Sequence, residues 1–112
     1  MDKLKRIFIE TAVFAKKWSE LDLTDGDLQE LQIFLLKNPA AGDIIKGTNG
    51  AKKVRFALSG KGKSGGIRVI YVDLIYDKKI YLLLCYTKSK QEDLTHEQKQ
   101  QLKVFIKAIK EE

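Results

Sequence analysis

The stretch "IRVIYVDLIYDKKIYLLLCY", residues 67–86, contains two apolar segments joined by a short polar turn. Both segments, 67–74 and 80–86, are apolar on both faces, as expected of inner strands that are covered on two sides. The "YDKK" between them, residues 76–79, is typical of a tight hairpin turn. The sequence therefore predicts a hairpin at the centre of a sheet.

The segments on either side of this hairpin extend the predicted sheet. "KKVRFAL", residues 52–58, alternates with a period of two, which is the signature of a half-buried strand. One face of that strand carries Lys52, Val54, Phe56 and Leu58, and the other carries Lys53, Arg55 and Ala57. We expect the first face to be core and the second to be basic. The N-terminal "KLKRIFIE", residues 3–10, is predicted as the first strand because it is rich in β-branched and aromatic residues.

Helical spacing identifies three further elements. Thr11 is a predicted cap for a helix that buries Phe14, Trp18 and Leu21 and ends near Leu21. A second helix starts at Thr24, buries Leu28, Leu31 and Leu35, and is stopped by Asn38 and Pro39. A third helix starts at Thr95, with Leu102, Phe105, Ile106 and Ile109 on its inward side. The predicted fold is α+β, in the order β-α-α-β-β-β-α. Its sheet is mainly antiparallel, with a helical hairpin on one face and a C-terminal helix.

Length and composition are those of a small globular protein. The 112 residues predict one domain, residues 1–112, and the apolar and charged fractions of 44% and 32% are near the average for soluble proteins. The longest apolar run, residues 80–86, is too short to cross a membrane, and the N-terminus lacks a secretory signal. The only cysteine, Cys85, is expected in the core. We therefore expect a cytoplasmic protein with no membrane association.

The positive charge is concentrated in one part of the chain. Residues 44–72 contain no acidic side chain but seven of the 21 basic ones, whereas the other 83 residues carry 14 basic and 15 acidic side chains. Such a local field favours an anionic partner. The alternative is a surface that is charged only for solubility.

The glycine-rich stretch "SGKGKSGG", residues 59–66, superficially resembles a nucleotide-binding P-loop. That motif requires a glycine where Ala57 stands and a helix after Ser64, where a strand is predicted instead. We interpret the stretch as a hairpin tip that carries Lys61 and Lys63, either as a solvated turn or as a grip on an anion. Whether Arg68, on the returning strand, shares a face with Lys53 depends on a register that the sequence does not give.

Two long stretches resemble a known family. They are "NPAAGDIIKGTNGAKKVRFALSGKGKSGGIRVIYV", residues 38–72, and "YLLLCYTKSKQEDLTHEQKQQLKVF", residues 81–105. With the order of elements, they resemble the RelE/ParE superfamily of bacterial type II toxins, and within it the HigB-type branch. The resemblance covers nearly the whole chain. It implies cleavage of messenger RNA on the ribosome without metal or cofactor. Members of this superfamily divide between that activity and poisoning of DNA gyrase, as ParE-type toxins do, and a non-catalytic RNA-binding module is a third alternative.

The resemblance also implies site residues and partners. Lys53, Arg55 and Arg68 match the basic active-site positions, with Arg68 expected to clamp the scissile phosphate and Arg55 to add a second donor. Lys53 and Lys88 are candidates for proton transfer or charge stabilisation, and Tyr86 for base stacking or proton sharing. The predicted RNA or ribosome contacts are Lys52, Lys61 and Lys63. The implied partner is an antitoxin, a HigA-like helix-turn-helix protein, through which alone the toxin would reach operator DNA.

The chain departs from the family just before its last helix. Many relatives carry a tyrosine there after an acidic residue, whereas this chain has Asp93, Leu94 and Thr95. His96, the only histidine, is a candidate replacement acid or base because its pKa lies near neutrality. The alternative is an exposed histidine at a helix terminus. No residues have the spacing of zinc ligands.

Overall fold

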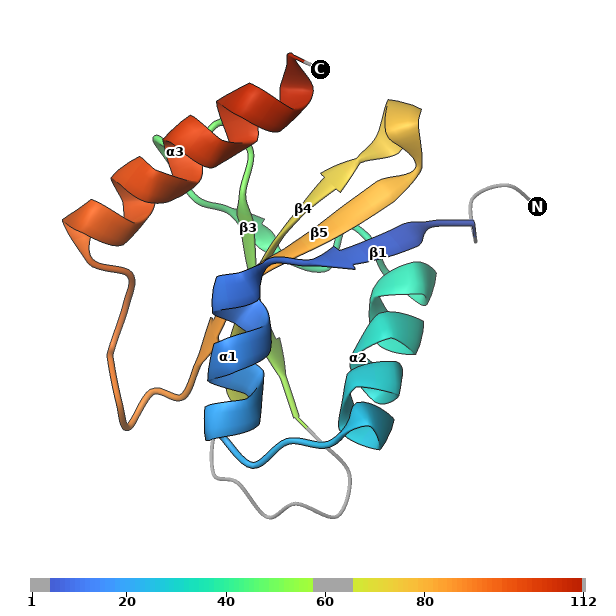
Figure 1. The fold of residues 1–112 in the computed structure, drawn as a ribbon, viewed down its shortest axis with the longest axis vertical. Helices are drawn as coiled ribbons and strands as arrows, with labels where there is room; N and C mark the ends of the chain where they lie inside the picture. The colour runs from blue at the N-terminus through green and yellow to red at the C-terminus, as the bar shows by residue number, and fades with distance from the viewer. Residues whose placement is uncertain (1–4, 58–65, 112) are drawn as a thin grey trace.

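The computed structural model describes residues 5–57 and 66–111, which form a five-stranded sheet packed against helices (Figure 1). The elements are β1 (Ile7–Glu10), α1 (Ala12–Glu20), α2 (Asp25–Lys37), β2 (Asp43–Ile44), β3 (Lys52–Phe56), β4 (Ile67–Leu74), the 3₁₀ turn η2 (Ile75–Asp77), β5 (Lys79–Tyr86) and α3 (His96–Lys110). The predicted fold class and order are confirmed, with β2 added. A two-residue strand is too short to show an alternating pattern. None of the described helices is long and apolar enough to cross a bilayer.

The strand order in the sheet is β1-β5-β4-β3-β2. β1 runs parallel to β5, and the other neighbouring strands pair antiparallel. The predicted central hairpin is therefore β4–β5. The first strand is shorter than predicted, because Lys5 and Arg6 precede it in irregular structure. Residues 3, 4 and 58, which the predicted strands included, lie outside the described part of the chain.

The predicted helix starts are confirmed by capping hydrogen bonds. The hydroxyl of Thr11 accepts from the backbone N–H of Phe14 at 3.1 Å. Thr24 and Thr95 each form a capping box, in which the threonine accepts from the N–H three residues later and that residue's side chain accepts in return. These bonds satisfy amides that have no partner inside the helix, so local sequence fixes where each helix begins.

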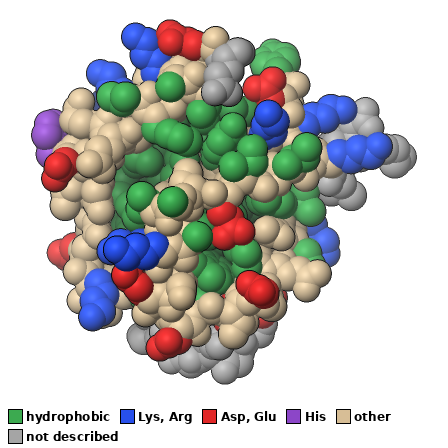
Figure 2. Space-filling view, in the orientation of Figure 1, with side chains coloured by type: hydrophobic (Ala, Val, Ile, Leu, Met, Phe, Trp, Pro, Cys, Tyr) green, Lys and Arg blue, Asp and Glu red, His purple; other side chains and the backbone are tan. Residues whose placement is uncertain are grey.

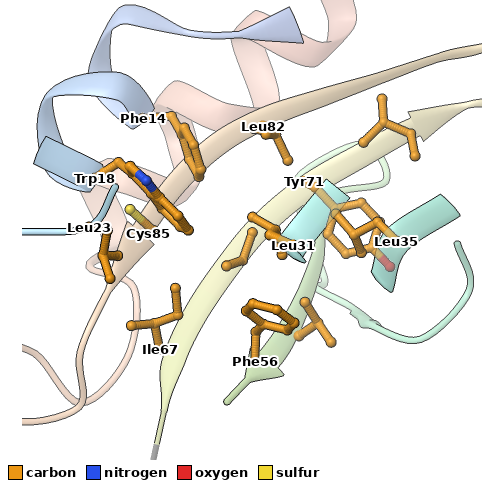
Figure 3. Packing of buried hydrophobic residues seen from close by; sticks show 13 residues of the cluster. Phe14, Trp18, Leu23, Leu31, Leu35, Phe56, Ile67, Tyr71, Leu82 and Cys85 are labelled. Atoms are coloured by element: carbon orange, nitrogen blue, oxygen red, sulfur yellow. The ribbon is translucent and has the colours of Figure 1, made fainter. Parts of the chain in front are cut away.

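One face of the sheet, which we call the core face, is covered by α1 and α2. Figure 3 shows how their side chains pack onto the strands, with Phe14 and Trp18 stacked at a centroid distance of 5.4 Å. The buried members of this cluster are Phe14, Trp18, Leu23, Leu31, Leu35, Val54, Phe56, Ile67, Val69, Tyr71, Ile80, Leu82 and Cys85. The predicted core positions of Trp18 and Cys85 are confirmed. Burial raises the pKa of the Cys85 thiol to about 12.

The other face, which we call the site face, is partly covered by α3. Leu102, Ile106 and Ile109 of α3 join a second apolar cluster with Ile70 and other strand residues. Phe105 was expected to point inward with them, but it is 37% exposed and lies edge-on to Tyr81 at a ring distance of 5.9 Å. It lies on the border of the buried stripe rather than in it.

A β-bulge in β5 changes which side chains reach the site face. Ile70 of β4 pairs with Leu84 and Tyr71 pairs with Leu82, so Leu83 is an extra residue with no partner of its own. Before the bulge, Leu82 belongs to the core-face cluster; after it, Leu84 and Tyr86 belong to the site-face cluster. Simple alternation from Leu82 would have placed Tyr86 on the core face. The extra residue therefore turns Tyr86 to the side of α3.

Much of the stretch that carries the family resemblance has a structural task. The hydroxyl of Tyr71, in the middle of β4, donates to the carbonyl of Pro39 at 2.8 Å and accepts from the N–H of Gly42 at 3.0 Å. Further on, the side-chain amide of Asn49 donates to the carbonyl of Lys103, which ties the loop before β3 to α3. Gly50 in this loop has a φ of +115°, a backbone conformation that residues with a side chain rarely adopt. These contacts hold α2, β3 and α3 in place around the sheet.

Candidate functional site

A line of polar side chains crosses the site face at one end of the sheet. In the strand register, Arg55 of β3 lies directly opposite Arg68 of β4, and Arg68 lies directly opposite Tyr86 of β5. Directly opposed residues share a face, and Lys53 shares it too because it is two residues from Arg55. We call Lys53, Arg55, Arg68 and Tyr86 the basic row. The register thus answers the question of faces that the sequence left open.

The two arginines of the basic row stand in an arrangement that favours an anion between them. Arg55 is exposed and Arg68 is half-buried. Two guanidinium groups on neighbouring strands present several donors to one region of the surface, which suits the oxygens of a phosphate group.

Tyr86 ends the basic row as a buried phenol. Its side chain is 5% exposed, and its hydroxyl oxygen is buried without a hydrogen-bond partner among the described residues. Burial raises the pKa of Tyr86, the negative charge of Asp93 raises it further, and the positive charge of Arg68 opposes them. The hydroxyl is therefore protonated at neutral pH and has a donor proton to offer. An unpartnered hydroxyl of this kind is unusual in a folded protein and is a feature of sites that meet a ligand.

Asp93 brings negative charge to the basic row from the segment between β5 and α3. Its carboxylate lies 3.3 Å from the ammonium of Lys53 and accepts from the backbone N–H of Leu94 at 2.7 Å. The hydrogen bond from Leu94 lowers the pKa of Asp93 most; burial opposes it by a smaller amount, and Lys53 and then Lys99 lower the pKa further. The pair is partly solvated, with side chains 35% and 58% exposed for Lys53 and Asp93. Such an ion pair is weak enough for a competing anion to replace the carboxylate.

A comparison with models of protein families identifies the family of this chain. The model described as "RelE toxin of RelE / RelB toxin-antitoxin system" matches residues 5–111. The chain belongs to the RelE toxin family. This confirms the superfamily that the sequence resembles, at the level of the RelE family.

Two solved structures share the fold of this RelE-family chain. One is an Escherichia coli RelE toxin with two arginines replaced by alanine, in the free state; it covers 79% of this chain and 88% of its own at 15% identity, with a TM-score of 0.54. The other is the intact Escherichia coli RelBE toxin–antitoxin complex, which covers 73% of this chain and 95% of its own at 15% identity, with a TM-score of 0.54. At this identity the likeness establishes the fold.

Four other predicted site residues of this RelE-family chain lie outside the basic row or outside the described residues. Lys52 alternates onto the core face with Val54, as the sequence indicates, so it lies on the other face from the row, and its predicted contact with RNA or the ribosome stays a prediction. Lys88 is exposed in the turn that follows β5, two residues beyond Tyr86. Lys61 and Lys63 lie in the stretch 58–65, which is outside the described residues.

His96 is the first residue of α3 and is exposed. Among the described residues, no hydrogen bond or ion pair joins its ring to the basic row. In the described ranges 5–57 and 66–111, no group of three or more His, Cys, Asp or Glu side chains is placed to hold a metal ion. The predicted absence of metal from the chemistry stays a prediction.

Asp93 is the site residue to which sequence reasoning gave no role. Its position before the last helix was noted only as the place where a tyrosine is missing. Its contact with Lys53 joins residues 40 positions apart, so no local pattern reveals it. The available signal was a pair of acidic side chains, Glu92 and Asp93, between a basic segment and a helix cap.

An apolar groove of about 450 Å³ lies apart from the basic row, between α1 and α3. Its floor includes Leu83 and Leu84 of β5, and its walls include Val13, Leu102 and Phe105. Figure 2 shows hydrophobic side chains gathered around this hollow. The row and the groove are thus two separate surfaces, one cationic and one apolar.

Proposed function

We propose that this protein is the toxin of a type II toxin–antitoxin system and cleaves messenger RNA on the ribosome, as a single-domain, cytoplasmic member of the HigB-type branch. The observation that supports this most is the register pairing of Arg55 with Arg68 beside the unpartnered hydroxyl of Tyr86. The exposed Arg55, the half-buried Arg68 and the buried phenol of Tyr86 stand side by side there at one end of the site face. Membership of the RelE toxin family also supports a toxin function for that site.

The proposed reaction needs no cofactor. The ribose 2′-hydroxyl loses its proton and its oxygen attacks the adjacent phosphorus; the bond to the 5′-oxygen of the next nucleotide breaks, and that oxygen gains a proton. The protein must hold the RNA in line, offset the added charge on the phosphate and move two protons. Arg68, half-buried at the centre of the row, clamps the phosphate, and the exposed Arg55 adds donors from the neighbouring strand.

The polar groups around the arginines can share the remaining tasks. Tyr86 is a neutral phenol beside Arg68, so its hydroxyl donates to a phosphate oxygen or to the leaving oxygen. Asp93 stays ionised at neutral pH because its pKa is lowered, and it holds Lys53 toward the row. When RNA phosphate replaces that carboxylate, Lys53 becomes a second source of charge stabilisation. The exposed Lys88 and His96 are the remaining candidates for proton transfer.

The proposed partners follow from the family. The antitoxin is a HigA-like helix-turn-helix protein that neutralises the toxin and alone contacts operator DNA; the related Escherichia coli RelE was solved bound to RelB. The ribosome supplies the messenger RNA. Lys61 and Lys63 are proposed to add contacts to RNA or to the ribosome.

The test is controlled expression in bacteria with mapping of transcript ends. We expect growth arrest with new cleavage sites for the natural protein, and neither for Arg68→Ala. The matched control is Lys37→Ala, which removes an exposed cation from α2 on the opposite side of the sheet. This control should arrest growth and cleave as the natural protein does.

Two other outcomes would replace the proposal. Growth arrest with intact transcripts and DNA-damage signalling would indicate gyrase inhibition of the ParE type. Salt-sensitive RNA binding without arrest or cleavage would indicate a non-catalytic RNA-binding module.

A further inference from the structure

One flank of α3 carries a line of lysines. Lys99, Lys103 and Lys107 recur every four residues, so they lie on the same side of the helix at intervals of about 6 Å. Lys103 and Lys107 are exposed and Lys99 is half-exposed. We call these three residues the lysine flank. It is distinct from the stripe of Leu102 and Ile106 that packs on the sheet.

The lysine flank is unfavourable for an isolated helix. Like charges four residues apart destabilise a helix by about 0.2–0.5 kcal/mol per pair. Among the described residues, no acidic side chain forms an ion pair with Lys99, Lys103 or Lys107. The acidic residue in the first turn, Glu97, lines a shallow hollow with Gln101 and Phe105, on the other side of the helix. The chain therefore does not neutralise this line of charge by its own described side chains.

The lysine flank starts close to the basic row. The backbone N–H of Lys99 donates to the carbonyl of Thr95 at 3.0 Å, two residues after Asp93, whose carboxylate contacts Lys53; the positive charge of Lys99 also helps to lower the pKa of Asp93. At the middle of α3, the amide of Asn49 donates to the carbonyl of Lys103 at 3.0 Å. Lys110 of α3 in turn donates to the carbonyl of Asn49 at 2.6 Å, so the loop before β3 lies against α3. The lysine flank thus starts next to the segment that carries Asp93, the residue in contact with Lys53, and extends from there along the helix.

The other flank of α3 faces the apolar groove and carries no line of lysines. It presents Gln98, Gln101 and Phe105 to the apolar groove. A polyanion that leaves the basic row therefore meets a line of cations on one side of the helix and, on the other, a mostly uncharged surface with Glu97 in its first turn and Lys17 across the groove. Lysine is a flexible point charge without arginine's fixed fork, which suits contacts that hold a phosphate backbone without reading bases.

We propose that the lysine flank of α3 binds the phosphate backbone of the single-stranded RNA segment that leads away from the basic row. The inference rests on the proposed function, since it names where that function's substrate runs beyond the reacting phosphate. The flank holds RNA without sequence preference and does not touch the reacting atoms.

The experiment compares two double variants of the full chain. Lys103→Gln with Lys107→Gln removes two charges from the flank, and Lys16→Gln with Lys37→Gln removes two exposed helical lysines from α1 and α2. The probe is a fluorescent single-stranded 2′-O-methyl oligonucleotide, which cannot undergo 2′-hydroxyl attack. Its affinity is measured from low to moderate salt. Thermal unfolding confirms that both variants are folded.

The expected result is a change in salt dependence. Each phosphate contact on a single strand contributes about 0.7 to the slope of log affinity against log salt, so losing two contacts should reduce the slope by about 1.4. The Lys16 and Lys37 control should keep the natural slope. An unchanged slope in the flank variant, or no binding of the probe by the natural protein, would overturn the inference.

Two further measurements, poly-glutamate binding and transcript mapping, distinguish the alternatives. Unchanged oligonucleotide slope with loss of poly-glutamate binding would assign the flank to an acidic protein partner and overturn the RNA path. Transcript mapping runs in parallel. Cleavage by the natural protein with no effect of the flank lysines on the slope defeats this inference alone. A reduced slope without cleavage by the natural protein defeats the proposed function and leaves the flank an RNA-binding surface.

Discussion

The two faces of the sheet are built from the same strands but have different tasks. On the core face, Val54 and Phe56 of β3 are buried under α1 and α2. On the site face, the alternating residues Lys53 and Arg55 point to the side that α3 only partly covers. The comparison teaches that stability and the proposed chemistry depend on residues adjacent in sequence but separated by the sheet. Substitutions on the two faces should therefore have separable effects.

The largest expected effect belongs to the core face. Leu31→Ala removes a fully buried side chain from α2, which should lower the free energy of unfolding by about 2–5 kcal/mol because a cavity remains. The control on the same helix is Ile33→Ala, at a side chain that is 46% exposed and should change stability far less. Chemical denaturation measures both. Equal effects of the two substitutions would contradict the described burial of α2.

Arg68→Ala tests the site face. Loss of one preorganised donor to a transition-state oxyanion typically lowers the rate by about 10²–10³, and we expect that loss in ribosome-dependent cleavage. Because Arg68 is only half-buried, the unfolding midpoint should move little. Arg68→Lys should recover only part of the rate, since lysine lacks the forked donor geometry. A variant that cleaves normally, or that loses activity only by unfolding, would remove Arg68 from the site.

Tyr86→Phe should separate stability from activity at one residue. Because the Tyr86 hydroxyl is buried without a partner, removing it should raise the free energy of unfolding by about 1 kcal/mol. Cleavage should fall at the same time, since the proposed proton donor is lost. Calorimetry and transcript mapping on the same preparations check both.

The difference in stability between Tyr86→Phe and the natural protein should depend on pH, in a direction that the pKa of Tyr86 fixes. The pKa of Tyr86 is raised in the folded protein, so its linked stability is present below the ordinary value of 10.0 and is lost as pH rises through the folded pKa. The advantage of Tyr86→Phe should therefore grow above pH 10. A Tyr86→Phe protein that is less stable than the natural one at neutral pH would show that the hydroxyl has a partner after all.

The smallest effect is expected for Asp93→Asn. The Lys53–Asp93 pair is largely solvated, so its loss should change stability at neutral pH by less than about 1 kcal/mol. The pKa of Asp93 is lowered in the folded protein, so the contribution is present above 3.8 and is lost as pH falls through the lower folded value. Unfolding curves of the two proteins should therefore converge in strong acid. RNA affinity should rise, because Lys53 no longer has a competing carboxylate.

The sequence predicted the helices and strands better than the register in which the strands pair. Capping threonines and helical spacing correctly placed α1, α2 and α3, because these signals act within a few residues. The alternation of β3 also correctly separated Val54 from Lys53. The pairing of Arg55 with Arg68 depended on a register between strands, which an alternating pattern does not contain.

The parts of the site that were missed depend on contacts distant in sequence. A bulge at Leu83 is invisible in "YLLLCY" because every residue around it is apolar, so Tyr86 could not be assigned to a face. Lys52 was proposed for RNA although its own alternation placed it with Val54. The four-residue spacing of Lys99, Lys103 and Lys107 was visible in the sequence of the predicted third helix, but no role was assigned to it.

The bulge reverses the alternation of side chains in β5, so even-numbered residues face opposite sides of the sheet before and after it. Before the bulge, the even-numbered residues Ile80 and Leu82 pack with α1 and α2, whereas after it the even-numbered residues Leu84 and Tyr86 belong to the cluster beneath α3. A family of variants randomised at Leu84 and Tyr86 would therefore explore the chemistry of the row without disturbing the hydrophobic interior on the other side. Removing Leu83 itself would restore a regular alternation after Leu82, with Cys85 still on the core face and Tyr86 still next to Arg68, whereas straightening the strand with Leu83 retained would turn Cys85 toward Arg68 in place of Tyr86.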